Sequence, residues 1–171
     1  MNTPKNYTIS LQFSRTMEVL NRGDRSLLIL LDPEGKYVLG SKEVYPKDIY
    51  RLAGGGVDQG EDPQIAAARE LKEELGIDRS PGEMEPKATI TIAVTSPEKT
   101  QEFQIFLFET KLRTTEKIVP ADDIQGVVHL STDEMKTLID RFSHLSDARD
   151  FSWSDYGKLY GRVHEIVLEL A

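Results

Sequence analysis

The chain has 171 residues and a formal net charge of −8, with 39% hydrophobic residues, 8% aromatic residues and no cysteine. This length and composition fit one globular domain with a substantial hydrophobic core. The lack of cysteine excludes disulfides, zinc–thiolate sites and thiol nucleophiles. The negative charge opposes binding to nucleic acids, and no apolar run reaches the about 20 residues that span a bilayer.

The first eight residues, MNTPKNYT, are polar and lack the apolar core of a secretory signal peptide. We therefore expect a single domain over residues 1–171 that acts in the cytoplasm and has no membrane partner. The charge argues against nucleic acid as a partner as well. A homodimer stays open as an alternative to a monomer.

Three strands are predicted before the middle of the chain. Residues Tyr7–Phe13 alternate apolar and polar side chains, which is typical of a half-buried strand. Residues Arg25–Leu31 contain the run LLILL and predict a strand buried on both faces. A turn at Asp32–Gly35 then leads to a short returning strand near Tyr37–Leu39. These elements indicate a mixed sheet.

The loop that follows carries basic side chains just before a run of glycines. Lys42, Lys47 and Arg51 lie close enough in sequence to Gly55 and Gly56 to contact phosphate oxygens at the edge of the glycine turn. Glycine lets a backbone approach such a ligand closely. We predict that Arg51, Gly55 and Gly56 contact the ligand; the alternative is a solvated loop.

The stretch Gly55–Ile77 places this turn directly before a short acidic helix. Asp62 is a favourable N-cap, Pro63 suits the first helical turn, and Gly76 suits a left-handed C-cap. At about 100° per residue, one side of the helix is apolar and the other is acidic. We expect a helix over Pro63–Leu75, an apolar stripe of Ile65, Ala68, Leu71 and Leu75, and an acidic side of Glu70, Glu73 and Glu74.

Three carboxylates beside a glycine turn predict a metal site. Like charges three and four positions apart on a helix repel each other, although only by a few tenths of a kcal/mol. Oxygen ligands that converge with a close backbone approach are what a hard cation such as Mg²⁺ requires. The alternative is a solvated acidic helix on an unrelated fold.

The second half of the chain predicts further strands and two helices. A turn over residues 96–100 joins two strands that are rich in β-branched and aromatic residues. Ser131 and Glu134 form a capping box before the next helix. The predicted strands are Lys87–Thr95, Glu102–Thr110, Lys111–Val119 and Gln125–Leu130, and the predicted helices are Thr132–Phe142 and a C-terminal segment over about residues 153–170.

Aromatic residues recur at helical spacing in the C-terminal segment, where Trp153, Tyr156 and Tyr160 are followed by His164. One interpretation is a wall for a nucleobase or sugar. We favour core or subunit packing, because aromatic stripes are usually buried. None of the histidines, His164 included, follows a metal-ligand spacing, so we expect them at the surface or in packing.

Read as G-x5-E-x7-R-E-U-x-E-E-x-G-U, with U aliphatic, the glycine turn and acidic helix resemble the signature of the Nudix hydrolase family at every fixed position. Nine fixed positions across 23 residues make this resemblance specific. It implies an α/β fold in which a mixed sheet is sandwiched between helices, and the predicted elements agree from about Tyr7 to Phe142. The matching positions are Gly55, Glu61, Arg69, Glu70, Leu71, Glu73, Glu74, Gly76 and Ile77.

The resemblance also implies a role for each carboxylate. Glu73 and Glu74 are similar to the principal Mg²⁺ or Mn²⁺ ligands of the family. Glu70 is similar to a further ligand, or to the group that orients or deprotonates the attacking water, and the Gly55 carbonyl is similar to an additional ligand. Two further residues resemble those that brace the loop against the helix, namely Glu61 and Arg69.

Many relatives take one more carboxylate from a loop outside the signature. The candidates here are Glu116, Asp122 and Asp123, with Glu98 behind them. The implied reaction is attack of water on a pyrophosphate linkage, in which the metal polarises the phosphoryl oxygen and lowers the pKa of bound water. The implied partner is therefore a small-molecule phosphate anhydride.

The sequence does not select one substrate. Residues that mark the ADP-ribose and dinucleoside polyphosphate subgroups of the family are absent beyond the signature, where Ala93, Val94 and Thr95 stand. Nucleotide sugars, ADP-ribose and modified nucleoside triphosphates stay open, and capped RNA is the least favoured because of the negative charge. The alternative function is a non-catalytic nucleotide or metabolite sensor on the same fold.

Overall fold

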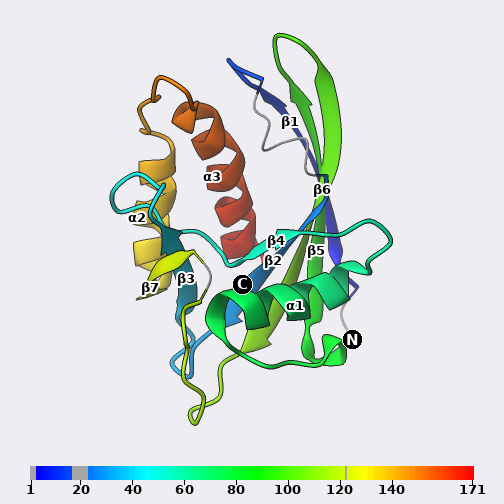
Figure 1. The fold of residues 1–171 in the computed structure, drawn as a ribbon, viewed down its shortest axis with the longest axis vertical. Coiled ribbons are helices and arrows are strands. Elements are labelled where there is room, and N and C mark those ends of the chain that lie inside the picture. The colour runs from blue at the N-terminus through cyan, green and yellow to red at the C-terminus, as the bar shows by residue number, and fades with distance from the viewer. Residues whose placement is uncertain (1–2, 17–22, 122) are drawn as a thin grey trace.

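The computed structural model describes residues 3–16, 23–121 and 123–171 (Figure 1). Its centre is a seven-stranded sheet in the order β1-β5-β6-β2-β3-β7, with the short β4 paired to β2. The strands are β1 (Lys5–Gln12), β2 (Arg25–Leu31), β3 (Tyr37–Lys42), β4 (Gly54–Gly56), β5 (Glu85–Thr95), β6 (Thr100–Lys111) and β7 (Ile124–Leu130). The helices are α1 (Pro63–Leu75), the short 3-10 helix η2 (Pro81–Glu83), α2 (Thr132–Phe142) and α3 (Trp153–Glu169).

Helices cover both faces of this sheet, with α1 on one face and α2 and α3 on the other (Figure 1). Successive side chains of a strand point to opposite faces. Along β2, Leu27 and Ile29 therefore join the core under α2 and α3, whereas Leu28 and Leu30 join the core under α1. The predicted strand with two buried faces is confirmed, and so is the sandwich of a mixed sheet between helices.

The pairing of β2 creates the place where the site forms. The C-terminal end of β2 pairs with β3 and its N-terminal end pairs with β4, both antiparallel, while parallel β6 occupies the other edge. The chain between β3 and β4 is held beside β2 and β3 by backbone hydrogen bonds. Gly40 N donates to Arg51 O at 3.0 Å, and Leu28 N donates to Ala53 O at 2.9 Å. These bonds hold the backbone directly before the glycines of β4 in place.

Local caps set the bounds of α1 as predicted. The Asp62 side chain accepts a hydrogen bond from Gln64 N at 2.8 Å, and the helix ends at Gly76 with a left-handed φ of 69°. The predicted apolar stripe is wrong at Ile65, which is 50% exposed. The first turns instead bury small alanines against the sheet, where the Ser26 hydroxyl on β2 donates to Pro63 O at 2.7 Å.

Among the residues that the structure describes, none of the helices combines the length and the hydropathy needed to cross a membrane.

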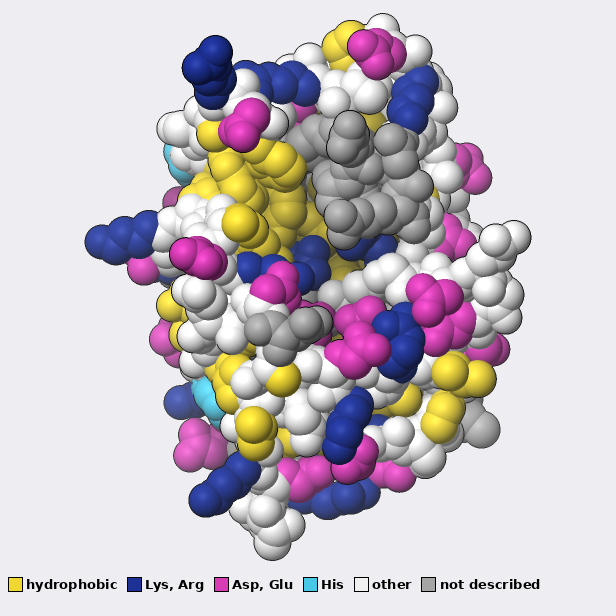
Figure 2. All heavy atoms as spheres, in the orientation of Figure 1, with side chains coloured by type: hydrophobic (Ala, Val, Ile, Leu, Met, Phe, Trp, Pro, Cys, Tyr) yellow, Lys and Arg dark blue, Asp and Glu magenta, His cyan; other side chains and the backbone are white. Residues whose placement is uncertain are grey.

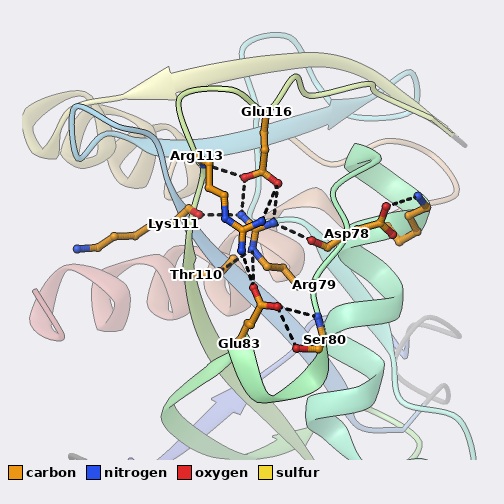
Figure 3. A network of polar contacts seen from close by, with 9 residues as sticks. Asp78, Arg79, Ser80, Glu83, Thr110, Lys111, Arg113 and Glu116 are labelled. Carbon is orange, nitrogen blue, oxygen red and sulfur yellow. Dashed lines mark hydrogen bonds and ion pairs between the residues drawn. The ribbon is translucent and has the colours of Figure 1, made fainter.

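The predicted strand over Lys111–Val119 is wrong, because β6 ends at Lys111 and turns follow. The Arg79 guanidinium explains the change. It donates to Lys111 O at 2.9 Å and to both carboxylate oxygens of Glu116 at 2.6 Å (Figure 3). The Glu116 carboxylate also accepts a hydrogen bond from Arg113 N at 2.8 Å. These bonds make the chain after Lys111 turn around the Arg79 side chain, so that it does not continue as an extended strand.

The same loop is tied to the end of α1. Val119 N donates to Leu75 O at 2.9 Å, and Ala121 N donates to Glu74 O at 3.0 Å. These bonds satisfy carbonyls that the last turn of a helix leaves without partners. These bonds place Ala121 next to the acidic helix, and Asp123 lines the same cavity as Glu70, Glu73 and Glu74.

We expect Gly157→Ala to lower the free energy of unfolding by about 1–3 kcal/mol, the usual range for overpacking. A Cβ atom at Gly157 would collide with the carbonyl oxygen of Phe142, where α3 passes the end of α2. Urea denaturation followed by circular dichroism measures the change. The control is Gly82→Ala, because no atom lies within 4 Å of the added Cβ. Equal stability of Gly157→Ala and wild type would contradict the close helix contact.

The Arg79–Glu116 pair predicts a pH dependence of stability. Hydrogen bonds from Arg79 lower the pKa of Glu116 from 4.5 to about 2. A carboxyl whose pKa falls on folding stabilises the protein above its unfolded pKa, and the contribution is lost as pH decreases. The stability deficit of Glu116→Gln should therefore be largest above pH 4.5 and shrink toward pH 2. Urea midpoints at successive pH values test this, and a pH-independent deficit would refute it.

Candidate active site

A cavity of about 810 Å³ opens beside the glycine turn, which is a usual size for a ligand site. Figure 2 shows a hollow lined by hydrophobic side chains, with Lys and Arg side chains at its lower end and Asp and Glu side chains beyond them. The lining residues fall into three chemical groups. The carboxylates are Glu70, Glu73, Glu74, Asp123 and Asp150, the cations are Arg25, Lys42 and Arg51, and the aromatic residues are Tyr45, Phe151, Trp153 and Tyr156.

Glu74 is buried, with 3% of the residue exposed, although the sequence predicted it on the exposed acidic side of the helix. The correction has a specific cause. Gly54 N donates a hydrogen bond of 2.7 Å to Glu74 Oε1, which draws the carboxylate under the glycine turn. Burial raises the pKa of Glu74, while the nearby positive charge of Arg51 opposes that increase. The residue thus joins the helix to the turn.

Glu70 packs directly against the backbone of Gly55. A Cβ atom at position 55 would lie 2.6 Å from Glu70 Oε1, so any other residue there would displace the Glu70 carboxylate. Burial raises the pKa of Glu70, and the negative charge of Glu74 adds to the increase. The two carboxylates therefore share a region that disfavours their combined negative charge. Glu73 is the most exposed of the three, with 47% of its side chain accessible.

Arg69 braces this arrangement, in agreement with the geometry that the resemblance implied. Its guanidinium donates to both carboxylate oxygens of Glu61 at 3.0 Å, to Gly56 O at 3.0 Å and to Glu70 Oε1 at 3.0 Å. One planar group thus connects the glycine strand, the loop before the helix and Glu70 on the helix.

Arg51 reaches the cavity from the loop before the turn. Its guanidinium is buried, donates to Gly54 O at 3.2 Å and lies 4.7 Å from the centre of the Tyr160 ring. Lys42 also lines the cavity and forms an ion pair of 3.2 Å with Asp123. Lys47 is exposed and is not among the described residues that line the cavity. Two of the three basic residues of this loop therefore line the cavity.

Of the candidate carboxylates outside the signature that the structure describes, Asp123 is the one that lines the cavity. Glu116 is held by Arg79 in the network of Figure 3. Glu98 is exposed in the turn between β5 and β6. Asp122 lies outside the described residues. The loop bonds to the end of α1 explain why Asp123 comes close to the acidic helix.

The C-terminal aromatic stripe divides between two environments. Tyr156 and Tyr160 are 5% and 3% exposed and belong to the core, although Tyr156 also contributes to the cavity wall. Trp153 lines the cavity and packs against Phe151 with ring centres 4.4 Å apart. Tyr45 is on the same wall. Sequence reasoning missed Tyr45 and Phe151 because neither belongs to a motif or a helical repeat.

The chemistry of the donor set fits a hard cation. Three signature carboxylates and Asp123 face one cavity, and Glu70 and Glu74 both have raised pKa values. Oxygen ligands of this kind are those that Mg²⁺ and Mn²⁺ take. Within the described chain, no three acidic or histidine side chains already stand close enough to hold an ion.

Solved structures share the overall fold at low sequence identity. A dihydroneopterin triphosphate pyrophosphohydrolase from E. coli matches with a TM-score of 0.56 and 18% identity, covering 86% of this chain and 96% of that one. An Ap4A hydrolase from C. elegans matches with a TM-score of 0.51 and 17% identity, covering 85% and 98%. A bifunctional NMN adenylyltransferase/ADP ribose pyrophosphatase from Francisella tularensis, in complex with AMP and a Mn ion, matches with a TM-score of 0.57 and 17% identity, covering 87% and 42%.

A sequence relative matches a shorter stretch. The RNA pyrophosphohydrolase of Gluconobacter oxydans (strain 621H) is 39% identical over 49 residues, which is 29% of this chain and 29% of that protein. The NUDIX domain matches far more, from residue 21 to residue 150. That span contains the glycine turn, the acidic helix and Asp123. With the signature, the sandwich fold and the domain match in agreement, this chain belongs to the family of proteins built on the NUDIX domain.

Proposed function

We propose that the protein is a metal-dependent hydrolase that cleaves the pyrophosphate linkage of a nucleoside diphosphate derivative. One observation carries this proposal: Glu70, Glu73 and Glu74 line a single cavity together with the cations Lys42 and Arg51. Such a cavity can hold a phosphate anhydride between its basic groups and an acidic metal-binding wall. Attack of water on one phosphorus breaks the bridging P–O bond and releases two phosphorylated products.

Each side chain has a proposed role. Arg51, Gly55 and Gly56 contact the phosphates, and the fixed guanidinium of Arg51 offsets their charge. Glu70 orients or deprotonates the attacking water, or acts as a further metal ligand. Glu74 keeps its position through Gly54 N–H, at 2.7 Å. Precise placement of these groups matters because much of the catalysis of phosphoryl transfer comes from positioning and electrostatics.

The residues that would hold Mg²⁺ or Mn²⁺ are Glu70, Glu73 and Glu74, with the Gly55 carbonyl and Asp123 as further ligands. When bound, the ion supplies charge neutralisation and a lowered pKa for water. It also offsets the repulsion between a protein of net charge −8 and an anionic substrate.

The aromatic wall favours a small substrate with a planar group. Tyr45, Phe151 and Trp153 are half-buried and present ring surface to the cavity. Nucleobases stack on such rings. Nucleotide sugars, ADP-ribose and nucleoside triphosphates all satisfy this chemistry. Long RNA fits less well, because the net charge of −8 opposes its backbone.

We expect Glu74→Gln and Glu73→Gln each to reduce kcat by about 100-fold or more while the protein stays folded, because each removes a proposed metal ligand. Product release from a panel of pyrophosphate compounds, with and without Mg²⁺ or Mn²⁺, measures this. Glu98→Gln on the exposed hairpin turn is the control. Undiminished turnover in both variants would refute the proposed ligands. No turnover of any compound by wild type, with ligand binding intact, would favour the sensor function instead.

Asp123→Asn should lower turnover at limiting metal, because Asp123 is the proposed carboxylate from outside the signature. The apparent metal concentration for half-maximal rate should rise, and excess metal should recover part of the activity. Glu116→Gln is the matched control, since Glu116 lies on the same loop as Asp123 but its carboxylate bonds to Arg79. The same metal dependence in Asp123→Asn and wild type would exclude this role.

A further inference from the structure

Helix α3 (Trp153–Glu169) follows the stretch that the NUDIX domain matches, yet two of its side chains contact the loop that enters the glycine turn. These side chains are Tyr160 and His164, one helical turn apart. Both are buried, at 3% and 0% exposure. Their contacts go beyond the packing that the sequence predicted for them.

The hydrogen bonds of His164 determine its tautomer. Its Nδ1 lies 2.6 Å from Tyr160 O, and a carbonyl oxygen can only accept, so Nδ1 carries the proton. Its Nε2 is then free to accept a hydrogen bond from Leu52 N at 3.2 Å. Burial lowers the pKa of His164 to about 4, so the neutral ring persists at neutral pH. The imidazole thus satisfies a buried backbone N–H that lies between Arg51 and the glycines.

Tyr160 supports the neighbouring side chain. The Arg51 guanidinium lies 4.7 Å from the centre of the Tyr160 ring, within the range of a cation–π interaction. The same guanidinium donates to Leu52 O at 3.3 Å and to Gly54 O at 3.2 Å. Its orientation is thus determined by an aromatic face on one side and by carbonyls of the loop on the other.

We infer that Tyr160 and His164 are positioning residues for the phosphate-binding edge of the cavity. His164 fixes the Leu52 peptide, and Tyr160 holds Arg51 in the orientation in which it lines the cavity with Gly54 and Glu74. The inference rests on the proposed function, because it takes Arg51 to meet a phosphate group. It adds that helix α3, outside the family signature, sets how tightly the anhydride binds.

The test separates positioning from packing by comparing Tyr160→Leu with Val163→Ala, a buried core residue on the same helix. The probe is methylenediphosphonate, a nonhydrolysable analogue of the anhydride, and its Kd is measured by calorimetry in Mg²⁺. Tyr160→Leu should weaken binding by about tenfold, the loss expected for a desolvated cation–π contact. KM should rise by a similar factor with little change in kcat. Val163→Ala should lose stability but bind the probe as wild type does.

A second pair of variants covers the case in which Tyr160→Leu does not fold. His164→Gln keeps an acceptor for Leu52 N–H, whereas His164→Leu removes it. Weaker probe binding in the leucine variant, with recovery in the glutamine variant, supports the inference. Probe affinity equal to wild type in the folded leucine variants overturns it and leaves the proposed hydrolase intact. Wild type that neither binds the probe nor turns over any pyrophosphate compound overturns both proposals.

Discussion

The hydrogen bond from Gly54 N to the buried Glu74 carboxylate joins the glycine turn to the acidic helix. A carboxylate with 3% exposure needs hydrogen-bond donors to offset lost hydration, and the glycine turn provides one at 2.7 Å. Gly54 can do so because its φ of 136° is open to glycine, and because a Cβ atom there would collide with Ser26 O on β2. The arrangement of β2, the glycine turn and α1 therefore depends on the close approach of the Gly54 backbone to Ser26 and Glu74.

That approach has an electrostatic consequence. Burial raises the pKa of both Glu70 and Glu74; the negative charge of Glu74 adds to the increase at Glu70, and that of Asp123 adds to the increase at Glu74. Arg69 and Arg51 offset part of this charge from either side, through Glu70 and through the loop at Gly54. A cavity that is acidic on one wall and basic on another suits a cation and an anion bound together, which is the chemistry that the proposed reaction needs.

Local signals were sufficient for part of this structure. Caps at Asp62 and Gly76 set both ends of α1, so the bounds of this helix were predictable from sequence. The continuous apolar run of β2 likewise predicted a strand that is buried on both faces. Tertiary contacts decided the remainder. Glu74 is buried and bonds to a turn twenty residues earlier, Ile65 is exposed while the alanines beside it are buried, and turns around Arg79 replace the strand predicted after β6. No periodicity in the sequence encodes such contacts.

The two halves of the cavity have different origins in the sequence. Its acidic wall comes from a signature of nine fixed positions, whereas Tyr45, Phe151 and Trp153 come from loops and a helix end with no shared motif. In the proposed reaction, the metal and the phosphates constrain the residues that perform the chemistry, but they do not constrain those that meet the remainder of the substrate. The signature therefore identifies the reaction class and leaves the substrate open. Helix α3 contributes to both halves, because its first residue, Trp153, lines the aromatic wall and its later residues, Tyr160 and His164, contact the loop beside the glycine turn.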